Sequence, residues 1–191
     1  ISTMRVDGIQ VINEGKQIIG FSGSTLFGLE NKLAPFKREP HSVIGSSCIG
    51  ASIVGGVCNN SGGALVKRGP AYTELSLYAK INLGGELVLV NELGIELGET
   101  PEEILTNLQT NNYTKNQIQF PDKLASDNEY QKRVRDVDAS TPARYNADGR
   151  RLHGASGCAG KIAVFAVRLD TYPIPKRQQV FYVGTNSSYV L

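Results

Sequence analysis

The chain has 191 residues, of which 40% are hydrophobic, and this is enough for one domain with a hydrophobic core or for one domain and part of a second. Its net charge of +2 at pH 7 is small, and no block of Lys and Arg is interleaved with aromatic residues, so the composition argues against nucleic-acid binding. No apolar run approaches the roughly 20 residues of a membrane-spanning helix, which leaves only peripheral attachment to a membrane open.

Short strands and a helix are expected at the start of the chain. The segments MRVD, IQVIN and KQIIGFSG alternate branched apolar residues with polar ones, and glycines mark the turns between them. In STLFGLENKL, three leucines recur at helical spacing behind Ser24 and Thr25, either of which could cap the first turn with its hydroxyl. We expect this helix to be limited by Pro35.

The middle of the chain predicts a hairpin and a second helix. Two alternating runs in residues 71–93 flank Gly84 and Gly85, which is the pattern of a β-hairpin. In GETPEEILTNL, Thr100 is the expected N-cap, Pro101 takes the first helical position, and Glu103 completes a capping box.

The second half is polar until two strand patterns near its end. Residues 107–160 predict a solvated helix and loops, although their charges leave open a basic rim near an anionic substrate or a membrane surface. The apolar run KIAVFAVRLDTY predicts a buried strand, and QQVFYVGT predicts another after a break at Pro173 and Pro175. The chain begins at Ile1 and ends just after a strand pattern, so we expect a fragment of a longer protein.

The cysteines indicate a reducing compartment and no metal site. Cys48, Cys58 and Cys158 form no Cys-x-x-Cys pair, and His41 and His153 are the only histidines, so a zinc site with four ligands has no support. An odd number of cysteines and the lack of a signal-like segment at the start indicate reduced thiols, most simply in the cytoplasm.

Two nucleotide-binding motifs do not fit the sequence. GASGCAGKI looks like a phosphate loop, but five residues rather than four separate its outer glycines, and Ile162 stands where a hydroxyl must bind magnesium. A Rossmann turn requires two glycines separated by one residue, and this spacing does not occur in the sequence.

The glycine-rich stretch at residues 44–63 is the strongest candidate for a binding site. It holds six glycines with serines and asparagines between them, a spacing that fits neither one helix nor one strand. Glycine lets backbone N–H groups approach a large flat or anionic ligand, and serine and asparagine add neutral donors. The alternative is a core loop whose glycines only permit tight turns and close packing, and the residue types do not choose between the two.

Four segments of the chain carry a resemblance to a known family. They are REPHSVIGSSCIGASIVGGVCNNSGGALVKRGPAYTELSLYAKIN, LGIELGETPEEIL, RVRDVDASTPARYNAD and SGCAGKIAVFAVRLDT. Together they closely resemble the quinone-dependent, FAD-containing respiratory D-lactate dehydrogenases of bacteria. The resemblance covers nearly the whole chain and weakens in residues 107–128.

The resemblance implies an α+β fold, in which the chain is the second subdomain of a PCMH-type FAD-binding domain of the vanillyl-alcohol-oxidase type. Such a subdomain is a mostly antiparallel sheet flanked by helices. Residues 1–169 would be the C-terminal part of the FAD-binding domain, and residues 170–191 would begin a substrate- and membrane-binding domain. The main pyrophosphate-binding loop would lie outside this chain.

The resemblance also implies FAD contacts at Gly45, Ser52, Gly62 and Val164. The two glycines would allow close approach of the backbone, Ser52 would supply a hydroxyl, and Val164 would offer its backbone N–H and C=O to the ring edge. The glycine-rich stretch would then clear space for the cofactor.

The reaction that the resemblance implies is oxidation of D-lactate to pyruvate, with electrons passing through FAD to membrane quinone. The enzyme would associate peripherally with the cytoplasmic side of the bacterial inner membrane. We assign no catalytic residue, because neither His41 nor His153 has neighbours in the sequence that indicate a base. Two alternatives remain: a flavin oxidoreductase of the same fold acting on another 2-hydroxy acid, and a non-catalytic fragment that holds no cofactor.

Overall fold

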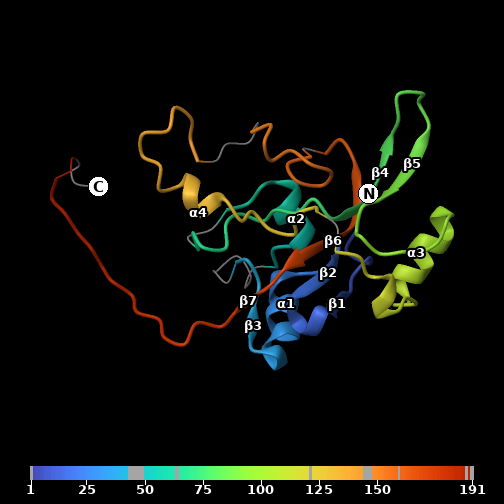
Figure 1. Cartoon of the computed structure of the whole chain (residues 1–191), viewed down its shortest axis with the longest axis horizontal. Coiled ribbons are helices and arrows are strands. Elements are labelled where there is room, and N and C mark those ends of the chain that lie inside the picture. Colours follow the sequence, from blue (N-terminus) through green and yellow to red (C-terminus); the bar gives the residue numbers. More distant parts are fainter. Residues whose placement is uncertain are drawn as a thin grey trace.

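The computed structural model describes residues 2–42, 50–62, 65–120, 122–143, 148–158, 160–187 and 189. These residues form a five-stranded antiparallel sheet in the order β1-β2-β6-β4-β5 (Figure 1). Its strands are β1 (Ile9–Ile12), β2 (Gln17–Phe21), β4 (Ser76–Ile81), β5 (Leu87–Asn91) and β6 (Ala163–Asp170). Two short strands, β3 (Arg38–Glu39) and β7 (Tyr172–Pro173), pair separately. The fold is therefore α+β with a mostly antiparallel sheet, as expected.

The predicted buried strand, β6, lies at the centre of the sheet. It pairs with β2 from Gln17–Asp170 to Phe21–Ala166 and with β4 on its other edge. The register with β4 shifts between Leu77 and Tyr78, which marks a β-bulge. The predicted hairpin is also confirmed, because β4 and β5 pair across the turn that contains Gly84 and Gly85.

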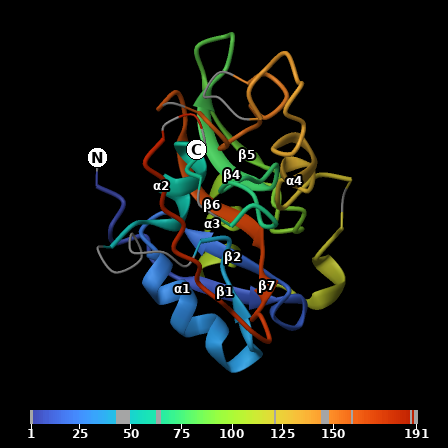
Figure 2. The same ribbon diagram turned by 90° about the vertical axis from the view of Figure 1, so that its left-hand side faces the viewer.

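Helices cover both faces of the sheet (Figures 1 and 2). Those that do so are α1 (Leu26–Leu33), α2 (Ile53–Cys58) and α3 (Pro101–Gln109); a single further turn, α4 (Tyr130–Arg133), lies in the loops that follow. The Thr25 hydroxyl caps α1, and the full capping box predicted at Thr100 and Glu103 is present at α3. None of the helices among the described residues is long and apolar enough to cross a bilayer.

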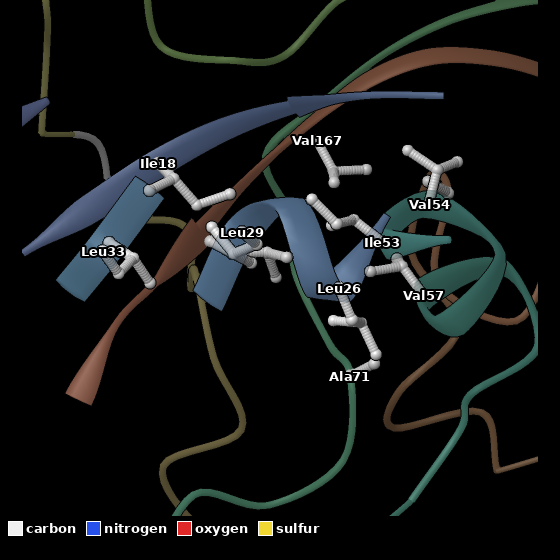
Figure 3. Close-up of a cluster of buried hydrophobic side chains, with 11 residues drawn as sticks. Ile18, Leu26, Leu29, Leu33, Ile53, Val54, Val57, Ala71 and Val167 are labelled. Atoms are coloured by element: carbon white, nitrogen blue, oxygen red, sulfur yellow. The ribbon is translucent and has the colours of Figure 1, made fainter. Parts of the chain in front are cut away.

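The first hydrophobic cluster lies between the sheet and the helices α1 and α2 (Figure 3). Its members include Leu29 and Leu33 of α1, Ile53 of α2 and Ile18 of β2, and all four are 1% exposed or less. Gly20 makes the contact with α2 close, because a Cβ at this position would lie 3.0 Å from Cδ1 of Ile53.

The second hydrophobic cluster lies on the other face, under α3. It joins Ile104 and Leu108 of α3 to Leu93 and Ile95, which follow the hairpin, and to Ile19 of β2. Neighbouring residues of β2 therefore serve opposite cores, as the alternation of side chains in a strand requires.

A fully buried arginine crosslinks the second face. The Arg168 guanidinium donates to the carbonyl oxygens of Leu93 and Gln119 at 3.0 and 2.8 Å and to Oε1 of Gln17 at 2.8 Å. It also lies over the Phe120 ring, 5.2 Å from its centroid. One side chain of β6 thus joins β2 to the segments that follow the hairpin and α3.

In the described part of the polar second half, a single helical turn and loops stand where a solvated helix and loops were predicted, and several of the charges pair with one another. The carboxylate of Asp127 is 1% exposed and pairs with Arg133 and with Arg151, whose Nε lies 3.2 Å from Oδ2. Both arginines also pair with Glu129.

Two sequence predictions of strands are wrong. MRVD forms turns rather than a strand, because its neighbour Gly8 and the first turn of the chain fold back over Gly23 and Phe21. The segment QQVFYVGT is extended but unpaired with any described residue, and Figure 1 shows it leading away from the body. Its apolar pattern is that of a strand, but Phe181 and Tyr182 are 74% and 97% exposed, so no described residue covers these side chains.

The body of the fold extends slightly beyond residue 169. β7 pairs with β3, and the N–H of Ile174 donates to the carbonyl of Lys37 at 3.2 Å. The division into residues 1–169 and 170–191 stays a prediction.

Candidate cofactor-binding site

A cavity of about 380 Å³ lies between the start of α1 and one side of α2. No charged residue is among those found to line it, which are Leu26, His41, Ser42, Ala51, Ser52, Gly55, Gly56, Ser61 and Gly62. The lining therefore combines hydroxyl groups, an imidazole and bare backbone with a small apolar surface. Such a surface suits a neutral, partly apolar group better than a phosphate.

The entrance to α2 is fixed by Ser52. Its Oγ accepts a hydrogen bond from the N–H of Gly55 at 3.0 Å and caps the helix. A backbone bridge joins Ser52 to Thr25, the cap of α1, and the N–H of Ile53 donates to the carbonyl of Ser24 at 2.9 Å. Since the cap uses Oγ only as an acceptor, the hydroxyl hydrogen remains able to bind a ligand.

The glycines of α2 serve the cap and the packing of the helix. A Cβ on Gly55 would lie 2.5 Å from Oγ of Ser52 and would break the cap. A Cβ on Gly56 would contact Ala71 at 3.5 Å and would lie 4.0 Å from Nε2 of His41. Of the two roles that the sequence left as alternatives, close packing is present at these glycines; both also line the cavity, and a cleared binding surface stays a prediction.

His41 is a lining residue that the sequence analysis did not identify. Its side chain is 8% exposed, and burial, with a smaller effect from Arg68, lowers its pKa to about 4. The imidazole is therefore neutral near pH 7 and can donate from one nitrogen and accept at the other. The only signal in the sequence was its place just before the glycine-rich stretch.

Arg68 fixes the backbone that carries His41. Its Nη1 donates to the carbonyl of Pro40 at 2.6 Å, and its Nη2 pairs with Glu39. The guanidinium also lies over the ring of Tyr172, 5.3 Å from the centroid. Arg68 thus fixes the backbone next to His41, and its positive charge disfavours protonation of the imidazole.

Of the four predicted FAD contacts, two line the cavity. Ser52 and Gly62 line the same cavity, whereas Gly45 lies outside the described residues. Val164 is not among the residues that line the cavity, but its side chain packs against the first hydrophobic cluster, to which α2 also belongs.

At Val164, β6 is no longer in register with β2 on one of its two edges. The register of β2 and β6 ends at Phe21 and Ala166, and the N–H of Ser22 donates to the carbonyl of Phe165. Val164 itself pairs with Tyr78 of β4 on the other edge.

Three curated proteins are similar to the chain along its entire length, although no family model matches it. The identity is 63% with a protein of Haemophilus influenzae, 59% with one of Escherichia coli and 44% with one of Corynebacterium glutamicum. Each of the three is named a quinone-dependent D-lactate dehydrogenase. The chain spans 34% of the first two proteins and 33% of the third, about one third of their length.

Proposed function

Because the chain matches the quinone-dependent D-lactate dehydrogenases along its whole length, we propose that it forms one wall of the FAD site in an enzyme of this kind. The enzyme would oxidise D-lactate to pyruvate and pass the electrons to membrane quinone. The observation that carries the proposal is the cavity beside α2, where Ser52 and Gly62 meet on a surface of neutral donors and bare backbone.

The residues present fit part of FAD. The cavity of about 380 Å³ is at the lower end of the roughly 300 to 1,000 Å³ that small-molecule sites occupy, as expected for a site completed by another segment. Hydroxyl groups and a neutral imidazole match the ribityl chain or the edge of the ring system. The diphosphate would be bound elsewhere, because the described residues of the lining offer it no cation.

When bound, FAD supplies the electron acceptor between lactate and quinone. The chain contributes binding and orientation: the Ser52 hydroxyl donates to the cofactor, and the backbone at Gly62 allows close approach. His41 adds a neutral hydrogen-bonding group, and Val164 offers backbone groups beyond the end of the β2 pairing. The base that takes the lactate hydroxyl proton is proposed to lie outside this chain, as is the segment that attaches peripherally to the cytoplasmic face of the membrane.

The activity is tested with the full-length protein that contains this chain. We expect it to purify with flavin absorbance and to reduce a soluble quinone analogue with D-lactate. Flavin with activity on a different 2-hydroxy acid would make the substrate assignment wrong, whereas an active protein without flavin would make the cofactor assignment wrong.

The site is tested by Gly62→Val, with Gly149→Val as its matched control. Gly149 lies on an exposed loop, and a Cβ there would meet nothing within 4 Å. We expect Gly62→Val to lower the flavin content per protein, and Gly149→Val to leave it unchanged. Equal flavin content in the two variants would remove Gly62 from the site.

A further inference from the structure

The C-terminal end of α2 meets a loop from the far end of the chain. The carbonyl of Val57 accepts a hydrogen bond from the N–H of Gly157 at 3.2 Å. A Cβ at Gly157 would lie 2.5 Å from Nδ2 of the Asn60 side chain, so this loop rests directly on the residues that follow the helix. Ala155, in the same loop, is fully buried in the first hydrophobic cluster beside Val57.

This contact brings two free thiols together. Cys58 is the last residue of α2, and Cys158 follows Gly157; both are partly exposed. The backbone hydrogen bond between Val57 and Gly157 lies one residue before each cysteine, so it brings Cys58 and Cys158 side by side although they are far apart in the sequence, and the two thiols are close enough to influence each other. A disulfide requires Cβ atoms about 3.5 to 4.5 Å apart, and neighbouring thiols on two hydrogen-bonded segments approach this geometry with little movement.

We propose that Cys58 and Cys158 are a redox-active pair that a low-molecular-weight disulfide, of the oxidised glutathione class, converts into an intramolecular disulfide. In the first step, the Cys158 thiolate attacks one sulfur of the small disulfide, forms a mixed disulfide and releases one thiol. In the second, the Cys58 sulfur attacks Cys158, loses its proton and releases the second thiol. In total the protein loses two protons and two electrons, and the small disulfide gains both.

The environment of Cys58 sets this order. Burial, together with the neighbouring Cys158, raises the pKa of Cys58 to about 12. A thiol that remains protonated is a poor nucleophile, so Cys58 is suited to the second, intramolecular attack, in which proximity compensates for low reactivity.

The disulfide would join two parts of the candidate cofactor wall. The N-terminal half of α2 lines the cavity, and the loop that carries Cys158 leads into β6 and Val164. A covalent bond between them would restrict the movement of the helix relative to the sheet without changing a residue that lines the cavity. It would also constrain the unfolded chain, because it closes a long loop.

The experiment uses the full-length protein in buffers with increasing ratios of oxidised to reduced glutathione. We expect the peptide with Cys58 to become linked to the peptide with Cys158 in a non-reducing digest, and dithiothreitol to restore both thiols. The result needs no variant, so a folding defect cannot obscure it. A lasting mixed disulfide at Cys158, a link that involves Cys48, or two thiols that remain free at a strongly oxidising ratio would each overturn the proposal.

Matched single variants sharpen the assignment. Cys48→Ser should leave the linked peptides unchanged, whereas Cys58→Ser should stop the reaction at a mixed disulfide on Cys158. Oxidation should raise the temperature of thermal unfolding of Cys48→Ser by several degrees and should leave that of Cys58→Ser unaltered. Equal shifts in the two variants would contradict a bond between these residues.

Discussion

The two faces of the sheet bury hydrophobic cores of similar kind, but the helices on them are built differently. On one face, α2 has only six residues, two of them glycines, and depends on the Ser52 cap and on its packing. On the other face, α3 has nine residues, a proline at its start and a complete capping box. Glycine costs about 1 kcal/mol per residue in a helix, so α2 is the weaker helix by its own sequence.

The face with α3 supports the fold, and the face with α2 carries the proposed binding surface. The face with α3 is tied together by the Arg168 guanidinium and offers tight packing around Leu108. The face with α2 gives up local helix stability at Gly55 and Gly56 and gains a cavity with bare backbone and neutral donors. The proposed binding surface is made from residues that weaken the helix that carries it, and tertiary contacts compensate.

The largest effect is expected from Arg168→Met on the supporting face. This change leaves the carbonyls of Leu93 and Gln119 and the amide of Gln17 buried without their donor, so the free energy of unfolding should fall by about 4 kcal/mol or more. Urea unfolding of the chain measures it. A loss below about 1 kcal/mol would mean that this face does not depend on the arginine.

The next effect compares one leucine from each face. Leu26→Ala and Leu108→Ala should each destabilise the chain by about 3 kcal/mol, because both side chains are 5% exposed or less in the two cores. Only Leu26 lines the cavity, so only Leu26→Ala should also reduce flavin retention in the full-length protein. Equal flavin loss in the two variants would show that the faces are not separate in function.

Much of the fold could be predicted from local patterns. The caps at Thr25 and Thr100, the hairpin at Gly84 and the apolar run of β6 each carry their signal within a few residues. QQVFYVGT fails for the same reason, since an alternating pattern indicates a strand but does not indicate whether a partner is present.

The site was less accessible to sequence reasoning. Ser52 and Gly62 could be suggested by the resemblance, and both line the cavity. His41 could not, because its neutral state depends first on burial by the folded chain and then on Arg68, which lies 27 positions further along the chain and reaches back to Pro40. The pairing of Cys58 with Cys158 is likewise a product of the packing of α2 against a distant loop.

A smaller, pH-dependent effect is expected on the binding face. Because the pKa of His41 is lowered to about 4 from an ordinary 6.5, the unfolded chain binds a proton more readily than the folded chain between these values. The stability that this residue contributes is complete above pH 6.5 and is lost as the pH falls toward 4, by about 2 kcal/mol between pH 7 and pH 5. Urea unfolding at both pH values measures the loss, and His41→Asn should remove this part of the pH dependence. An unchanged pH dependence in His41→Asn would place the protonating group elsewhere.

The smallest effect compares the caps of the two helices. Ser52→Ala and Thr100→Ala each remove a hydroxyl that accepts from the backbone N–H of the third residue of the helix, at 3.0 and 3.3 Å, and each should cost about 1 kcal/mol. The two variants are expected to differ in a second measurement, the flavin dissociation constant of the full-length protein. Ser52→Ala should weaken binding about five- to tenfold through loss of one hydrogen bond, and Thr100→Ala should not change it. If both variants lose stability equally and bind flavin equally well, the Ser52 hydroxyl serves only as a cap, and the cavity beside α2 has lost its best-placed donor to the cofactor.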